Sequence, residues 1–139
     1  SGALEKSSCD GVAIATWART HDELVEAAIE ANKHIMVEKP FTLQLAPAQR
    51  LTEMAKARGL KIVVTQQWRY MPGQRTVRCL LTEAAYGEPQ TGHMLTYKAY
   101  GSEYLDSDDS QLWQMTGHEI DSLIAMVNRR VAEVYGYCY

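Results

Sequence analysis

The sequence predicts an α/β fold in which three short parallel strands alternate with two helices, followed by an α+β region with antiparallel strands. Apolar runs of the length of a buried strand occupy residues 11–15, 34–37 and 61–65. The two segments between these runs repeat their apolar residues every three or four positions, which is typical of amphipathic helices. Strands that alternate with helical crossovers form parallel sheets, so we expect two consecutive βαβ units.

Local signals mark where the two expected helices begin and end. Residues 20–23 (Thr-His-Asp-Glu) have the Ser/Thr-x-x-Glu form of a capping box, so the first helix should begin there. Asn32 is suited to the left-handed conformation that ends a helix. Pro47 fits the first turn of the second helix, and Gly59 fits its end. Both helices therefore fit between the apolar runs.

The pattern changes after the third apolar run, which predicts a domain boundary near residues 66–73. A short helix with Val77, Leu80 and Leu81 facing inward is expected next. We therefore assign residues 1–70 to a first domain and residues 71–139 to a second.

The second domain should contain antiparallel strands. Apolar residues alternate loosely over residues 91–100 and again over 131–139, as in strands with one solvated face. Residues 101–110 are rich in serine and acidic residues and are expected to form a solvated loop. An amphipathic helix is expected to begin near Met115 and to carry its apolar residues over 120–127, so helix and strand alternate irregularly in this half.

Composition excludes several functional classes. The chain has 139 residues, a net charge of −3, 46% hydrophobic and 22% charged residues, which is typical of a globular protein of one-domain size. Lys and Arg are scattered, so neither nucleic acid nor an anionic membrane is an expected partner. No apolar run is long enough to span a bilayer, and we expect a cytoplasmic location. Cys9, Cys79 and Cys138 show no C-x-x-C spacing and should be reduced thiols.

The turn Glu38-Lys39-Pro40 is the strongest candidate site. Two opposite charges and a proline directly follow a four-residue apolar run that should be a strand buried on both faces. Parallel sheets bind their ligands at the carboxyl ends of the strands, where this turn would lie. A solvated ion pair between Glu38 and Lys39 is the structural alternative.

Together with residues 12–16 (Val-Ala-Ile-Ala-Thr) and 61–72 (Lys-Ile-Val-Val-Thr-Gln-Gln-Trp-Arg-Tyr-Met-Pro), this turn closely resembles the Gfo/Idh/MocA family. These are NAD(P)-dependent oxidoreductases such as glucose-fructose oxidoreductase and inositol 2-dehydrogenase, and the resemblance runs from about Asp10 to the C-terminus. It implies the second half of a Rossmann sheet, followed by the start of an α+β domain that binds substrate and makes the oligomer. It also implies hydride transfer between NAD or NADP and a secondary alcohol of a sugar, inositol or related polyol.

The family's subunits are more than twice this length and begin with a Gly-x-Gly-x-x-Gly turn that holds the cofactor pyrophosphate. This sequence contains no such motif. We therefore expect a fragment without the N-terminal glycine-rich part, whose own activity is doubtful and whose cofactor binding is weak or absent. A noncatalytic fragment that serves as a ligand-binding or assembly module, or a remnant without a role, are the alternatives.

The resemblance implies roles for the residues after the first two strands. Lys39 would contact both substrate and nicotinamide, Glu38 the nicotinamide ribose, and Pro40 would follow a cis peptide bond. Trp17 would cover the nicotinamide ring or, alternatively, pack its own loop, and His21 would order that loop from the helix start. The expected cofactor-binding residues are Thr16, Trp17, His21, Glu38, Lys39 and Pro40.

His118 is the second expected catalytic residue, with Lys39. An imidazole can take a proton from an alcohol as hydride leaves, although a lone helical histidine is often structural. Residues 114–121 (Gln-Met-Thr-Gly-His-Glu-Ile-Asp) resemble the family pattern Asp-x-x-x-His-x-x-Asp, in which the histidine is the acid-base residue. The first position is Gln114 here, and an amide can orient an imidazole but cannot stabilise its cation as a carboxylate does.

The expected substrate-binding residues are Lys39, Arg69, Gln114 and His118. Arg69 offers a planar set of donors to an oxygen-rich ligand, and a buried structural ion pair is an equal alternative. His118 and Asp121 lie one helical turn apart, but without a third ligand we expect no metal site. The C-terminal strands should present an open apolar edge, so we expect a homo-oligomer built through them.

Overall fold

The computed structural model of the 139-residue chain describes residue 4 and residues 6–83, 86–97 and 116–137. Its centre is a three-stranded parallel sheet in the order β1 (Gly11–Ile14), β2 (His34–Val37) and β3 (Ile62–Val64). The strands pair so that Ile14 lies opposite Val37, and Val37 opposite Val64. The predicted parallel sheet is confirmed.

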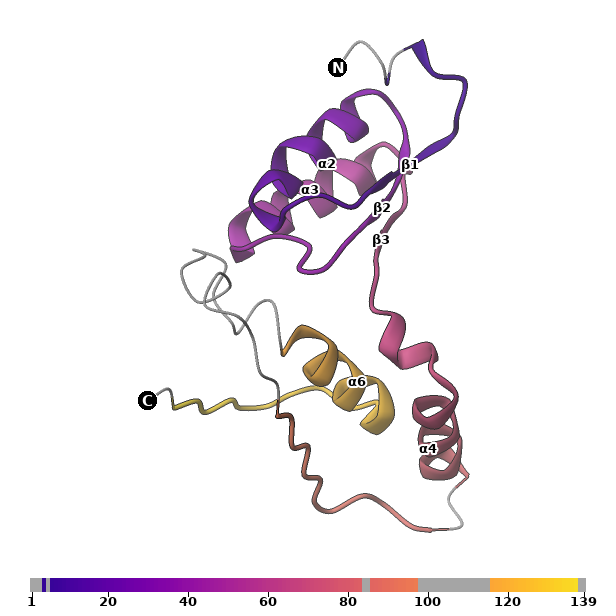
Figure 1. Cartoon of the computed structure of the whole chain (residues 1–139), viewed down its shortest axis with the longest axis vertical. Helices are drawn as coiled ribbons and strands as arrows, with labels where there is room; N and C mark the ends of the chain where they lie inside the picture. Colours follow the sequence, from indigo (N-terminus) through magenta and orange to yellow (C-terminus); the bar gives the residue numbers. More distant parts are fainter. Residues whose placement is uncertain (1–3, 5, 84–85, 98–115, 138–139) are drawn as a thin grey trace.

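Two helices lie on the same side of this sheet (Figure 1). They are α2 (His21–Glu30) and α3 (Leu45–Ala57), each of which crosses from one strand to the next. The hydrophobic core lies between these helices and the strands. Its buried members are Ile14, Val25, Ala28, Ile29, Ile35, Val37, Leu51 and Ala55. The inward position of Leu51 and Ala55 agrees with the helical periodicity.

The opposite face of the sheet is open among the described residues. Ala13, Met36 and Val63 lie side by side in the strand register and are all exposed. The expectation that the second strand is buried on both faces is therefore wrong within the described part of the chain. Its side chains alternate between exposed and buried, because α2 and α3 cover only one face.

The helix ends follow the sequence signals with one exception. Asn32 and Gly59 adopt the expected left-handed conformation, with φ of 57° and 69°. Thr20 makes no capping hydrogen bond, so the predicted capping box is wrong. A short 3₁₀ helix, η1 (Ala18–Thr20), precedes α2 and gives Thr20 a helical conformation, and its hydroxyl donates to the Trp17 carbonyl oxygen at 2.8 Å. The hydroxyl is therefore unavailable to cap α2.

A helical pair occupies the other end of the molecule (Figure 1). The 3₁₀ helix η2 (Gln67–Tyr70) leads from the sheet into α4 (Pro72–Thr82), which packs against α6 (Gly117–Val127). The inward orientation is wrong for Val77 and Leu80, which are exposed, while Leu81 is half-buried. No residue of α4 is fully buried. Within the described part of the chain, nothing covers that side of α4.

The antiparallel strands expected in the second half are not formed in its described parts. Residues 91–97 and 131–137 run without strand pairing, and Figure 1 shows both as chain without strand arrows. A strand needs a partner for its N–H and C=O groups, and neither segment meets one among the described residues. The ends of both expected strands, at 98–100 and 138–139, and the loop at 101–110 lie outside the described residues.

Truncation of the buried Leu51 should destabilise the sheet half strongly. Leu51→Ala should lower the free energy of unfolding by about 2–5 kcal/mol, because it leaves a cavity beneath β2. Leu45→Ala is the matched control on the same helix, since Leu45 is 72% exposed, and it should change stability by less than about 0.5 kcal/mol. Urea unfolding followed by circular dichroism measures both, and equal losses would contradict the assigned core.

Candidate functional site

The turn after β2 is held by the strand ladder on both sides. The Glu38 N–H donates to the Ile14 carbonyl oxygen at 2.9 Å, and the Thr65 N–H donates to the Val37 carbonyl oxygen at 2.9 Å. Lys39 N–H donates to the Glu38 carboxylate at 3.2 Å. The Lys39–Pro40 bond is cis, which confirms that prediction. The backbone directly before Lys39 is therefore fixed to both neighbouring strands.

His21 joins this turn to the loop after β1. Its ring is fully buried, with Nδ1 2.8 Å from the Pro40 carbonyl oxygen and Nε2 3.2 Å from the Thr16 carbonyl oxygen. Each ring nitrogen thus faces a different loop, and one imidazole connects the two. This position agrees with the expectation that His21 orders the loop from the start of its helix.

The loop after β1 presents a large aromatic side chain. Trp17 is 60% exposed, so its ring does not pack its own loop into the interior. Below it, the Thr20 hydroxyl lies 2.8 Å from the Thr16 hydroxyl and 2.8 Å from the Trp17 carbonyl oxygen. The backbone of the loop is therefore held by hydrogen bonds, while the indole ring remains on the surface at the carboxyl end of β1.

The segment after β3 holds His118 by two contacts. Nδ1 of His118 lies 2.9 Å from Oε1 of Gln66, and the Trp68 ring stacks on the imidazole with 5.2 Å between centroids and 13° between planes. His118 is buried, and it lies in the first turn of α6. The helix begins at Gly117, two residues later than the sequence suggested. The expected orienting residue, Gln114, lies outside the described residues.

An ion pair fixes the same segment to α6 one turn further along. Arg69 Nε donates to Asp121 Oδ2 at 2.8 Å, and Arg69 Nη2 donates to Asp121 Oδ1. The hydrogen bonds from the guanidinium to the carboxylate raise the pKa of Arg69 above its ordinary value. Of the two roles left open for Arg69, the structure thus shows the ion pair, which occupies two of its donor nitrogens.

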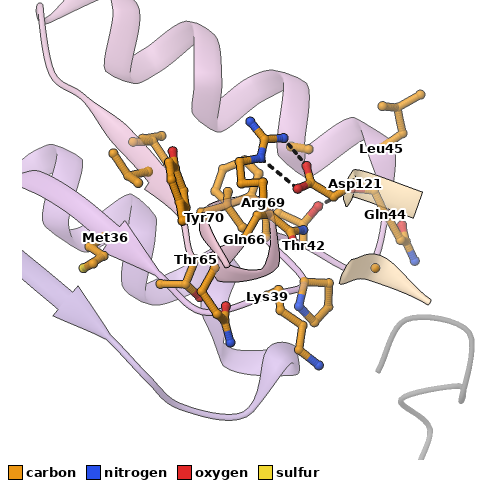
Figure 2. A pocket seen from close by; sticks show the side chains of 18 residues that line it. Met36, Lys39, Thr42, Gln44, Leu45, Thr65, Gln66, Arg69, Tyr70 and Asp121 are labelled. Atoms are coloured by element: carbon orange, nitrogen blue, oxygen red, sulfur yellow. Dashed lines mark hydrogen bonds and ion pairs between the residues drawn. The ribbon is translucent and has the colours of Figure 1, made fainter. Parts of the chain in front are cut away.

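A cavity of about 830 Å³ lies at the junction of the sheet and the helical pair. The residues that line it come from β2, α3, β3, η2, α6 and the connections between them. In Figure 2, Arg69 and Asp121 point toward one another, whereas the Lys39 side chain extends away from them. The polar residues that line the cavity are Lys39, Thr42, Gln44, Thr65, Gln66, Gln67, Arg69, Tyr70 and Asp121. Apolar side chains such as Phe41 and Ile62 form the rest.

The cavity brings together three residues that the sequence singled out, Lys39, Pro40 and Arg69. It does not include the other expected site residues that the structure describes, which are Thr16, Trp17, His21, Glu38 and His118. His118 contacts Gln66, and Gln66 does line the cavity. Gln66 belongs to the segment that resembles the family, but nothing in the sequence links it to a histidine 52 residues away.

The described residues offer no metal site. No three His, Cys, Asp or Glu side chains in the described part of the chain are grouped as metal ligands would be. The Asp121 carboxylate, considered with His118 as a ligand pair, binds Arg69 instead. Among the helices of the described residues, none is both long and apolar enough to cross a bilayer.

Comparison with known proteins gives consistent results. Residues 2–66 match the family model described as "Oxidoreductase family, NAD-binding Rossmann fold". Inositol 2-dehydrogenase 3 of Saccharopolyspora erythraea is 32% identical over 126 residues, which is 86% of this chain and 36% of that protein. The chain thus spans about a third of the length of this curated relative. A dTDP-sugar 3-reductase from Actinomadura kijaniata is 34% identical over 85 residues, which is 61% of this chain and 26% of that protein.

Solved structures give the same fold. A probable dehydrogenase from Thermotoga maritima superposes with a TM-score of 0.78 over 94% of this chain and 40% of its own, at 21% identity. A point mutant of a 3-ketoreductase from Actinomadura kijaniata, crystallised with TDP-benzene and NADP, superposes with a TM-score of 0.56 over 63% of this chain and 28% of its own, at 31% identity. The strand order, the turn after β2 and these relatives lead to one assignment: the chain belongs to the Gfo/Idh/MocA family of oxidoreductases with an NAD-binding Rossmann fold.

Proposed function

We propose that the protein carrying this chain is an NAD- or NADP-dependent oxidoreductase that acts on a secondary alcohol of a sugar, inositol or related polyol. The observation that carries the proposal is the turn after β2, where Lys39 lines a cavity and directly follows two residues that are hydrogen-bonded to the neighbouring strands. Family membership supports the reaction type, and the inositol 2-dehydrogenase relative supports the substrate class.

Two residues would carry the chemistry. Lys39 would donate hydrogen bonds to the reacting hydroxyl oxygen, because an ammonium group has three donors and no acceptor. His118 would accept the hydroxyl proton as the carbon gives up its hydride, so that the alcohol becomes a ketone. The nicotinamide cofactor, when bound, supplies the hydride acceptor. The chain's own residues would orient the substrate and move one proton.

The strand ends fit one end of a nicotinamide cofactor. The loop of Thr16 and Trp17 and the turn of Lys39 and Pro40 are joined through His21 at the carboxyl ends of adjacent strands. Parallel sheets bind dinucleotides in such a crevice, so these residues, with Glu38, fit the nicotinamide end. The sequence has no glycine-rich turn that would hold the pyrophosphate. The other end of the cofactor therefore has no matching turn in this chain.

The proposed position of the nicotinamide at the strand ends fits a division of the chain into two domains. Residues 1–70 would be the carboxyl-terminal half of a dinucleotide-binding Rossmann domain. Residues 71–139 would begin an α+β domain for substrate binding and assembly. The cofactor would be NAD or NADP. The family description names NAD, and the related 3-ketoreductase was crystallised with NADP, so the two cofactors are equally supported.

The 139-residue chain alone should bind NADH and NADPH weakly. We expect a roughly millimolar Kd, about −4 kcal/mol, because nicotinamide and ribose contacts remain without a pyrophosphate site. Titration calorimetry, together with quenching of the exposed Trp17, measures the affinity. A micromolar Kd would show that the chain itself holds the phosphates.

In the protein carrying this chain, Lys39→Ala should lower kcat at least about 100-fold, because Lys39 positions the reacting hydroxyl. Lys56→Ala is the matched control, since Lys56 is exposed on α3 and should leave kcat unchanged. The assay follows nicotinamide reduction with NAD and NADP against a panel of inositols, sugars and other polyols. The proposed function is wrong if no member of the panel is oxidised, or if the two variants behave alike.

The chain should self-associate through its C-terminal segment. Val131, Val134, Tyr135 and Tyr137 are exposed on residues 131–137, and exposed apolar residues so close together favour burial against another chain. We expect an oligomer by sedimentation equilibrium at micromolar concentration, and a shift toward monomer in Val134→Glu. A single 15.6 kDa species in the unmodified chain would contradict this.

A further inference from the structure

The strongest unassigned feature of the molecule is the fully buried histidine between the two loops of the candidate site. His21 is the first residue of α2, and none of its surface is exposed. Its Nδ1 lies 2.8 Å from the Pro40 carbonyl oxygen, and its Nε2 lies 3.2 Å from the Thr16 carbonyl oxygen. Burial of an imidazole costs free energy unless its polar atoms are hydrogen-bonded. These two contacts therefore compensate the burial of the ring.

The two contacts also restrict where the ring proton lies. Both oxygens belong to backbone carbonyl groups, which can only accept hydrogen bonds. At least one nitrogen of His21 must therefore donate, and a neutral imidazole has one N–H whereas an imidazolium has two. The contact of Nδ1 with Pro40 is the shorter one, so we assign a proton to Nδ1 in either charge state.

The contact with Pro40 supports the turn that carries Lys39 on its outgoing side. Directly before Lys39, the Glu38 N–H and the Val37 carbonyl oxygen are hydrogen-bonded to the neighbouring strands. After Lys39 the chain leaves the sheet and runs to the start of α3 at Leu45. The Pro40 carbonyl lies on this outgoing side, and proline has a fixed φ. Holding this carbonyl therefore restricts the backbone that follows Lys39.

His21 extends from a helix that is itself fixed to the sheet. The His21 N–H donates to the Ala18 carbonyl oxygen, which joins α2 to η1. Further along α2, Val25, Ala28 and Ile29 are buried in the hydrophobic core. The ring thus attaches both loops to one packed helix.

We propose that His21 is a positioning residue that donates from Nδ1 to the Pro40 carbonyl and so keeps the Lys39 turn in place relative to the loop of Thr16 and Trp17. In this role the ring acts through the backbone of the two loops and does not touch the reacting atoms. The consequence for catalysis by Lys39 rests on the proposed function. The hydrogen bond to Pro40 does not.

The proton on Nδ1 is measured directly on the 139-residue chain by NMR with ¹⁵N-labelled histidine. The chain has four histidines, and the His21 signals are identified by their loss in His21→Asn or His21→Gln. The ¹⁵N shift of His21 Nδ1 should be that of a protonated nitrogen, and its proton should exchange slowly with solvent because the ring is buried. An unprotonated Nδ1 in the unmodified chain would overturn the proposal, whether or not any variant folds.

Three substitutions of His21 separate the two contacts. The side-chain nitrogen of asparagine is as many bonds from Cβ as Nδ1 of histidine, so His21→Asn should keep the donor to Pro40 and lose the contact with Thr16. The side-chain nitrogen of glutamine corresponds in the same way to Nε2, so His21→Gln should do the reverse. His21→Phe keeps an aromatic ring in the buried site but has no donor for either carbonyl.

The ¹³C signals of the Pro40 and Thr16 carbonyl carbons report these contacts, because they shift when a hydrogen bond to the oxygen is lost. The Pro40 signal should move in His21→Gln and His21→Phe but not in His21→Asn. Val25→Ala is the control, since Val25 is equally buried on the same helix and should lower stability without moving either signal. An unmoved Pro40 signal in both His21→Gln and His21→Phe would overturn the proposal.

In the protein carrying this chain, the same variants should separate kcat from KM. His21→Asn should keep kcat within about threefold and raise the KM for the cofactor, because it releases only the Thr16 loop. His21→Gln should lower kcat at least about tenfold, because it releases the Lys39 turn. Equal kinetic effects of the two variants would indicate a role in stability alone and overturn the proposal. If the Pro40 signal moves as expected but the unmodified protein oxidises no polyol, the contact is confirmed and the proposed function is rejected.

Discussion

Hydrogen bonding between the parallel strands is the constraint on which the rest of the structure depends. The ladder continues beyond the strands, from Glu38 to the Ile14 carbonyl and from Thr65 to the Val37 carbonyl. Because the strands are parallel, the segments that follow them begin at the same edge of the sheet. A shift of one residue would turn Val37 away from α2 and α3 and toward the open face. Core packing and site geometry are therefore fixed by one register.

The helical end of the molecule is organised differently. A surface helix usually buries its apolar stripe, but α6 buries His118, Glu119 and Ser122 and leaves Ile120 and Leu123 exposed. Its contacts with the segment after β3 are an ion pair, a hydrogen bond to an amide and a ring stack. These directional contacts, rather than apolar burial, set the orientation of α6 against η2. The same orientation places His118 against Gln66, which lines the cavity.

Sequence patterns predicted the sheet half well because its determinants are local. Apolar runs, helical periodicity and the left-handed positions at Asn32 and Gly59 all act within a few residues. Prediction failed where the outcome depended on a partner. Thr20 lost its capping role to a 3₁₀ turn that competes for the same hydroxyl, and residues 91–97 and 131–137 have strand-like alternation but meet no neighbouring strand among the described residues.

The residues of the candidate site also differ in whether local sequence or a distant partner determines their position. Lys39 was identifiable because its chemistry follows from one strand and the turn after it. The sequence suggests Gln114 as a residue that orients His118, since a four-residue spacing on a helix is visible in the sequence. Gln114 lies outside the described residues, and the contact that the structure shows, with Gln66, joins positions 52 residues apart, beside the ion pair between Arg69 and Asp121. The imidazole thus contacts a segment distant in the sequence, whereas the backbone that leads into Lys39 is held by the strand ladder. Changes in how α6 lies against η2 should therefore alter the orientation of His118 while leaving the position of Lys39 intact.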